Sequence, residues 1–130
     1  MSQLQKVRVA LQKQQAEALI ITNDQNRRYL TGFTGSAGTV VITPTQAMLL
    51  VDFRYIEQAM KQSRAFEVRQ IDRTHLYDTI QEILDTESIQ TVGFEQQHVS
   101  YYTYQLIASK LTATLKPLSN IVEDLRMIKT

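Results

Sequence analysis

The chain has 130 residues with 14 basic and 13 acidic side chains, a net charge of +1 and no cysteine. This near-neutral balance, with no basic block beyond Arg27-Arg28, gives no case for nucleic-acid binding, and the missing cysteines exclude disulfides and thiolate metal sites and fit a cytoplasmic location. Because the N-terminus lacks an apolar signal core and no apolar run approaches the roughly 20 residues of a membrane span, we expect neither secretion nor membrane insertion.

The first third predicts a helix, a strand and a short helix. An amphipathic helical stripe comes first, formed by Leu4, Val7 and Leu11. The continuous apolar run 18–22 is too short for a helix and predicts a buried central strand. A short helix should then begin near Asp24, with Thr22 or Asp24 as its cap.

Three of the four glycines lie in the segment 26–38. Glycine reaches positive φ freely, so the clustering indicates a backbone shape that other residues resist. We expect Gly32 to end the short helix in a left-handed cap, and Gly38 to open a β-branched strand over 39–43. Phe33–Ala37 should therefore form a tight loop between a helix and a strand.

The next segment predicts a hairpin and a helix. Strands at 39–43 and 47–51 flank Pro44, which favours a turn and makes the sheet mixed rather than purely parallel. Asp52 should end the second strand and cap a helix over 53–62. The side chains that this helix is expected to bury are Ile56, Ala59 and Met60.

The second half continues the alternation of strands and helices. Strands are predicted at 66–71, half-exposed and near a sheet edge, at 91–94, and at 114–116 before Pro117. Three helices are predicted, each with an N-cap and an apolar stripe. Thr74 should cap a helix that buries Leu76, Ile80, Ile83 and Leu84, and Ser100 should cap a helix whose apolar face is Tyr104, Ile107, Ala108 and Leu111. In the last helix Asn120 and Glu123 have the spacing of a capping box, and the stripe is Ile121, Leu125 and Ile128. This order predicts a three-layer α/β domain with a mixed five- or six-stranded sheet flanked by helices.

Three kinds of site can be tested against the residues. A phosphate cradle needs a helix N-terminus after its glycines, but here a strand follows. A nucleophile elbow needs Gly-x-Ser-x-Gly between strand and helix, whereas Ser36 precedes a strand. The two histidines, His75 and His98, fall on different predicted elements without paired metal-ligand spacing, so we expect no metal site in this chain.

The segment Asp52-Phe53-Arg54-Tyr55 is the second notable cluster. Arginine grips carboxylates bidentately, so Arg54 and Tyr55 could face a cleft. Alternatively, Arg54 pairs with Asp52 or Glu57 on the surface, where an ion pair contributes little.

Four segments resemble the N-terminal domain of the Xaa-Pro peptidases, the family of prolidase, aminopeptidase P and creatinase. The segment 26–38, Asn-Arg-Arg-Tyr-Leu-Thr-Gly-Phe-Thr-Gly-Ser-Ala-Gly, resembles the first signature of that domain. Residues 52–59 resemble the second, with Phe53 in place of the usual glycine, and Val92-Gly93-Phe94-Glu95 resembles the third. Residues 125–130 are similar to the hinge into the second domain of the family.

The resemblance implies a non-catalytic domain at 1–124 and, at 125–130, the start of a hinge to a C-terminal pita-bread catalytic domain. That domain would hold two divalent metals, commonly manganese, and this chain would contribute no catalytic residue and no metal ligand. The implied partners are the catalytic domain itself, a second copy in a homodimer and a proline-containing peptide substrate.

The resemblance also implies roles for individual residues. The rim of the substrate pocket would be formed by Phe33, Thr34, Gly35, Ser36, Ala37, Arg54 and Tyr55. Structural motif positions would be Tyr29, Gly32, Gly38 and Asp52. Two alternatives stay open: a domain from a catalytically inactive pita-bread relative that binds peptides or proteins, and a stand-alone α/β module that binds a small ligand at the glycine loop.

Overall fold

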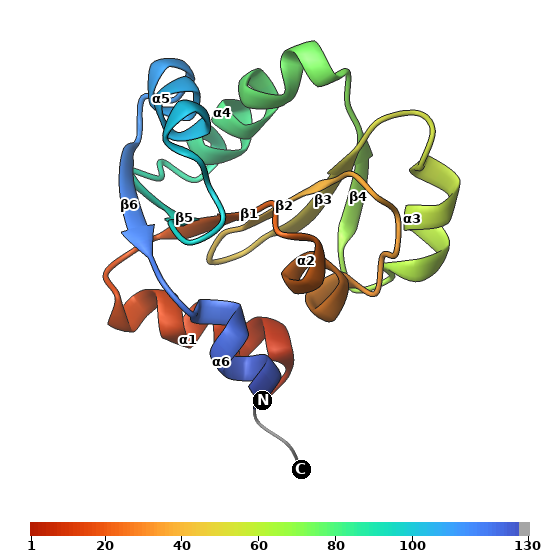
Figure 1. Cartoon of the computed structure of the whole chain (residues 1–130), viewed down its shortest axis with the longest axis horizontal. Coiled ribbons are helices and arrows are strands. Elements are labelled where there is room, and N and C mark those ends of the chain that lie inside the picture. The colour runs from red at the N-terminus through yellow and green to blue at the C-terminus, as the bar shows by residue number, and fades with distance from the viewer. Residues whose placement is uncertain (128–130) are drawn as a thin grey trace.

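The computed structural model describes residues 1–127 and forms a six-stranded mixed sheet with helices on both faces (Figure 1). The strands are β1 (Ala18–Ile21), β2 (Thr39–Ile42), β3 (Ala47–Val51), β4 (Glu67–Gln70), β5 (Thr91–Glu95) and β6 (Thr114–Leu118). The helices are α1 (Gln3–Lys13), α2 (Asp24–Thr31), α3 (Ile56–Gln62), α4 (Leu76–Thr86), α5 (Tyr101–Lys110) and α6 (Ile121–Met127), and a 3₁₀ turn, η1 (Arg73–His75), precedes α4.

The sheet has the order β4-β3-β2-β1-β5-β6. Strand β2 is antiparallel to both β1 and β3, while β4, β5 and β6 join their neighbours in parallel. The predicted hairpin, the mixed sheet and the edge position of β4 are therefore confirmed. Pro117 lies in β6, at the other edge, where a missing N–H is tolerated.

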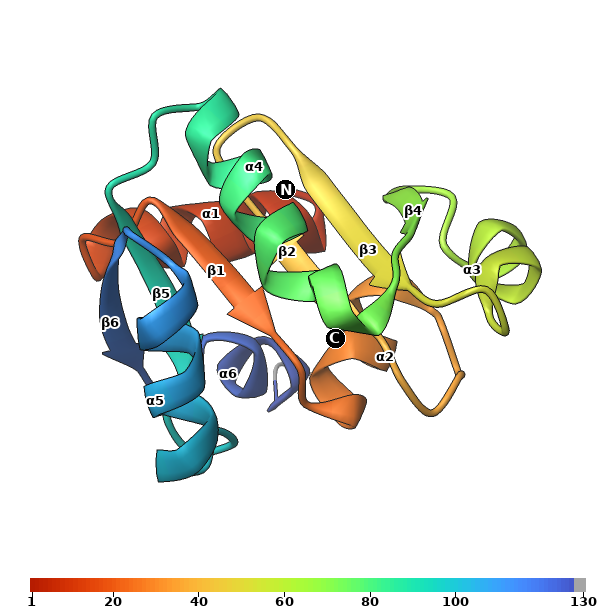
Figure 2. The same ribbon diagram turned by 90° about the horizontal axis from the view of Figure 1, so that it is seen from above.

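Two hydrophobic cores explain the continuous apolar sequence of β1. Leu19 and Ile21 face one core, with α1 and α6, while Ala18 and Ile20 face the other, with α4 and α5. Figures 1 and 2 show these helix pairs on opposite sides of the sheet. Every side chain of a central strand is buried when both faces are covered, which removes the usual alternation of apolar and polar residues.

Helix α2 ends at the predicted residue but has a different N-cap from the one predicted. Helix α2 ends at Gly32, whose φ of 79° is left-handed. Its N-cap is Asn23, however, and neither Thr22 nor Asp24: the Asn23 side chain accepts from the backbone N–H of Asn26 at 2.9 Å. Asn23 has the extended backbone that a cap requires, whereas Asp24 already lies inside the helix.

Helix α3 starts later than predicted, at Ile56. Asp52 does not cap it, because residues 52–55 form a separate turn in which the Tyr55 N–H donates to the Asp52 carbonyl at 3.1 Å. The side chain of Asp52 accepts from the Arg54 N–H within this turn. Ala59 is fully buried and Ile56 partly so, but Met60 is 62% exposed, since α3 covers only the rim of the sheet.

Three further predictions about helices were wrong. Asp72, rather than Thr74, caps the turn before α4: the Asp72 side chain accepts a hydrogen bond from the backbone N–H of Thr74. Ala108 is exposed although its predicted companions Ile107 and Leu111 are buried. Glu123 does not complete a capping box, because its carboxylate accepts from Asn26 and His98. Ile128, in the last predicted stripe, and the end of the proposed hinge lie outside the described residues.

In residues 1–127, none of the helices has the length and apolar character needed to cross a bilayer. Helix α6 runs across position 124, so the proposed boundary between domain and hinge falls within a continuous helix.

Candidate functional site

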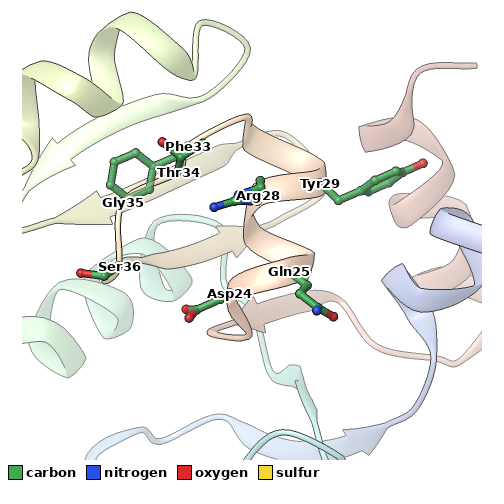
Figure 3. Close-up of a pocket in the computed structure, with 8 residues that line it drawn as sticks. All are labelled: Asp24, Gln25, Arg28, Tyr29, Phe33, Thr34, Gly35 and Ser36. Atoms are coloured by element: carbon green, nitrogen blue, oxygen red, sulfur yellow. The ribbon is translucent and has the colours of Figure 1, made fainter.

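An open pocket of about 520 Å³ lies between helix α2 and the loop that follows it (Figure 3). Its walls are Asp24, Gln25, Arg28, Tyr29, Phe33, Thr34, Gly35 and Ser36. Four of the seven predicted rim residues are among them, all from the glycine loop. The other four wall residues come from α2, whose contribution was not predicted.

Arg27 stabilises the glycine loop from the buried side. Its side chain is 2% exposed, and its guanidinium donates to the carbonyls of Gly35 at 2.9 Å and Gly38 at 3.1 Å. It also donates to the Thr22 carbonyl at 3.2 Å and to the Asp24 carboxylate at 2.9 Å. A planar guanidinium carries five N–H donors, so one side chain can bind several loop carbonyls that would otherwise be unpaired.

Phe33, one of the rim residues implied by the resemblance, lies beneath the loop and is only 1% exposed. Its ring meets the Tyr55 ring edge to face at 5.8 Å. It also explains Gly35, where an added Cβ would come within 2.2 Å of the ring carbon Cζ. Gly35 is therefore required by a close approach of an aromatic ring and not by a positive φ.

Helix α3 and Tyr55, the residue just before it, hold the outer side of the loop. The Ser36 hydroxyl lies 2.6 Å from the Tyr55 hydroxyl, and the Thr34 N–H donates to the Gln62 side chain at 3.0 Å. The Gln58 amide donates to the Thr34 hydroxyl at 3.0 Å. Because the partner of Ser36 is a phenol rather than a histidine, the geometry offers no general base for a serine nucleophile.

Arg28 is the one cation among the pocket residues, and its side chain is exposed. Figure 3 shows it extending from α2 toward the loop, while Tyr29 points away toward α1. Within residues 1–127 Arg28 takes part in no ion pair. The pocket can therefore offer a guanidinium to an anionic group, such as a carboxylate.

The remaining predicted rim residues lie beside this pocket. Tyr55 contacts the loop through Phe33 and Ser36, and Ala37 lines a neighbouring hollow with Gly38. Arg54 lies in another hollow, where its guanidinium donates to both carboxylate oxygens of Asp52, at 3.1 and 2.8 Å. This hydrogen-bonded pairing holds the pKa of Asp52 below its usual value. The surface pairing with Asp52 is therefore the arrangement observed for Arg54.

A second cluster, which the sequence analysis missed, joins Glu95, His98 and Glu123. One ligand-type atom from each lies within 4.8 Å of the others, a composition compatible with a cation. Burial raises the pKa of Glu95. Partial burial of Glu123 acts to raise its pKa. Hydrogen bonds from Asn26 and His98 outweigh this effect, so the pKa of Glu123 is lowered. The spacing Glu95-x-x-His98 at the end of a strand could have indicated from the sequence that these two side chains lie together. Glu123 is too distant in sequence to be associated with them.

The hydrogen bonds of this cluster favour a proton network over a cation site. The Asn23 side-chain oxygen is used as the helix cap, so its amide nitrogen faces Nδ1 of His98 at 3.3 Å and must donate to it. The proton of the neutral ring then lies on Nε2, which donates to Glu123 at 2.5 Å. A cation that binds Nε2 would have to displace this proton and break the hydrogen bond to Glu123.

Comparisons with known proteins agree with this fold. Residues 3–128 match the model of the creatinase/prolidase N-terminal domain. An uncharacterized peptidase, YqhT of Bacillus subtilis, is 38% identical over 128 residues, which cover 98% of this chain and 36% of that protein.

Solved structures show the same domain. An Xaa-Pro dipeptidase from Bacillus anthracis superimposes with a TM-score of 0.92 at 35% identity, covering 98% of this chain and 36% of that one. The N-terminal domain of the cytoplasmic peptidase PepQ from Mycobacterium tuberculosis H37Rv superimposes with a TM-score of 0.85 at 27% identity, covering 95% of this chain and 98% of that one.

The fold and the family match over residues 3–128 define an α/β domain of the kind found in Xaa-Pro peptidases. The chain belongs to the creatinase/prolidase N-terminal domain family. It spans little more than a third of the length of the B. subtilis and B. anthracis relatives, at 36% of each.

Proposed function

We propose that this chain is the non-catalytic N-terminal domain of an Xaa-Pro dipeptidase or Xaa-Pro aminopeptidase, and that the α2–loop pocket forms part of the rim of the substrate site. The observation that carries the proposal is the composition of that pocket. It offers one guanidinium, one carboxylate, hydroxyls and backbone groups, which suit binding and positioning of a peptide. Hydrolysis by paired metals would require a convergent set of carboxylates and imidazoles.

The partners follow from the same proposal. The chemistry would be supplied by a C-terminal pita-bread domain with two divalent metals, commonly manganese, and the assembled enzyme would be a homodimer. The matched part covers 36% of the B. anthracis dipeptidase, so most of that enzyme lies outside the region shared with this chain. A cytoplasmic location is supported by the absence of cysteine and by the similarity to PepQ, which is described as a cytoplasmic peptidase.

The test is kinetic and uses this chain joined to a family catalytic domain. Arg28→Gln and Ser36→Ala should change KM or the preferred peptide length, with kcat largely kept, because both side chains lie outside the reacting centre. Lys110→Gln on α5, across the sheet, is the matched surface control. If both pocket variants behave like the control on dipeptides and longer Xaa-Pro peptides, the rim assignment is wrong.

One observation favours a second candidate, the stand-alone ligand-binding module. Arg28 is exposed and unpaired within residues 1–127, as an anion-binding group would be. Calorimetry of the chain against nucleotides and inorganic phosphate separates the two functions, because tight binding of these anions supports the module. The inactive pita-bread relative is distinguished by its second domain, which would lack the two Asp, one His and two Glu that hold the metals.

A further inference from the structure

A buried polar junction connects three elements that are distant in sequence. The side-chain amide of Asn26, on α2, donates to Glu95 at the end of β5 at 2.5 Å and to Glu123 on α6 at 2.9 Å. Asn26 is fully buried and Glu95 is 6% exposed. One neutral amide thus lies between two carboxyl groups, one of which is almost entirely removed from water.

Two atoms of this junction lack partners. Oε1 of Glu95 and Oδ1 of Asn26 are buried and accept no hydrogen bond. Both atoms are hydrogen-bond acceptors when Glu95 is ionised, so neither can donate a hydrogen bond to the other. A proton on Glu95 converts one carboxyl oxygen into a donor and removes a negative charge from a buried position.

The charged groups around Glu95 do not neutralise it. Glu123 faces it from α6 and raises its pKa through like charge, while His98, in the loop after β5, acts in the opposite direction. Helix α2 contributes only the neutral Asn26 and the backbone of Asn23. His98 is already hydrogen-bonded to Glu123, and none of the ion pairs found within residues 1–127 involves Glu95.

We propose that Asn26, Glu95 and Glu123 form a proton-operated clasp that fastens α6 to the body of the domain. In the closed state Glu95 carries a proton and Glu123 is ionised; when Glu95 loses its proton, two carboxylates share one amide and α6 loosens. The inference is independent of the proposed peptidase role.

The clasp is connected to the pocket through α2. The Tyr29 hydroxyl donates to the Leu125 carbonyl at 3.3 Å, and Arg126 donates to the Gln25 side chain at 3.1 Å. Tyr29 and Gln25 both line the pocket. Release of α6 therefore removes two contacts that hold pocket residues in place.

The sign of the pH effect follows from the directions of the two pKa shifts. The pKa of Glu95 is raised in the closed state, so its contribution is complete below the ordinary glutamate pKa and is lost as pH rises through the raised value. The pKa of Glu123 is lowered, so its contribution is lost as pH falls through that lower value. The clasp is tightest between these limits.

The test measures the clasp directly by amide hydrogen exchange of α6 in the 130-residue chain, corrected for intrinsic rates, from pH 4.5 to 8. In the wild type the opening constant of α6 should rise by up to about tenfold per pH unit until the Glu95 pKa is passed. Glu95→Gln, which resembles the protonated acid, should keep α6 protected and abolish this slope. Glu57→Gln, on the exposed surface of α3, should retain it.

A carbon-13 titration of the Glu95 carboxyl in the wild type keeps the test independent of the variants. The proposal requires a pKa above the usual glutamate value. A normal pKa, or a slope that persists in Glu95→Gln, overturns it. The exchange series is repeated with EDTA and with Zn²⁺: identical results support the proton clasp, whereas Zn²⁺ protection of α6 that is lost in Glu95→Gln identifies a metal site and overturns it.

Discussion

The guanidinium carbon of Arg27 lies 6.0 Å from the centroid of the Phe33 ring, and both side chains are almost completely buried. This pair forms the support on which the glycine loop rests. The guanidinium binds the loop carbonyls, and the ring fills the space left by Gly35. The shape of the pocket wall is therefore set by residues that are themselves inaccessible.

Arg27→Lys should destabilise the chain by about 2–4 kcal/mol, measured by urea unfolding. An ammonium group cannot reach several carbonyls from one plane, so buried acceptors are left without donors. Arg28→Lys, one residue along the same helix and exposed, should stay within about 0.5 kcal/mol of the wild type. Equal stability of the two variants would show that Arg27 does not hold the loop.

Gly32→Ala should also be costly, by about 1–3 kcal/mol. An L-residue at this left-handed cap is strained by about 1–2 kcal/mol, and the added Cβ would lie 2.9 Å from the Gln62 carbonyl oxygen. Gly38→Ala is the matched control, because its Cβ would meet its nearest neighbours at 3.4 Å. We expect thermal denaturation to show a clear loss only for Gly32→Ala, and similar losses for both would contradict this explanation.

Arg54→Gln should raise the pKa of Asp52 back toward its usual value. The Arg54 side chain is the main cause of the depressed pKa. A depressed folded-state pKa stabilises the fold above the unfolded-state pKa and is lost as pH falls through the folded value, so the variant should lose part of its acid resistance. The check is a carbon-13 titration of Asp52. Glu67→Gln, on β4, is the control and should leave this titration unchanged.

Sequence periodicity was sufficient for the fold class because the relevant signals are local, whereas the strand order was not predicted. The apolar run of β1, the β-branched run of β2 and the left-handed stop at Gly32 each depend on nearby residues, and the structure confirms them. The start of α3 was misplaced for a related reason. The side chain of Asp52 can close a short turn or cap a helix. Which of the two forms depends on the position and direction in which β3 ends.

The missed parts of the site depend on contacts that no local pattern encodes. Arginine is usually exposed, and the burial of Arg27 becomes favourable only after the loop has placed its carbonyls around the guanidinium. Asn26 is separated from Glu95 by 69 positions and from Glu123 by 97. Such a junction becomes visible only when β5, α2 and α6 are assembled.

The central claim is that this chain shapes a peptide site while the hydrolytic chemistry lies in another domain. The direct measurement is release of the N-terminal residue from Ala-Pro and from longer Ala-Pro-containing peptides by the purified 130-residue chain with added Mn²⁺, beside the same chain joined to a family catalytic domain. We predict that the joined protein hydrolyses the peptides and that the chain alone releases no more of the N-terminal residue than Mn²⁺ in buffer. Turnover that rises in proportion to the concentration of the chain alone, and is abolished by EDTA, would contradict the claim.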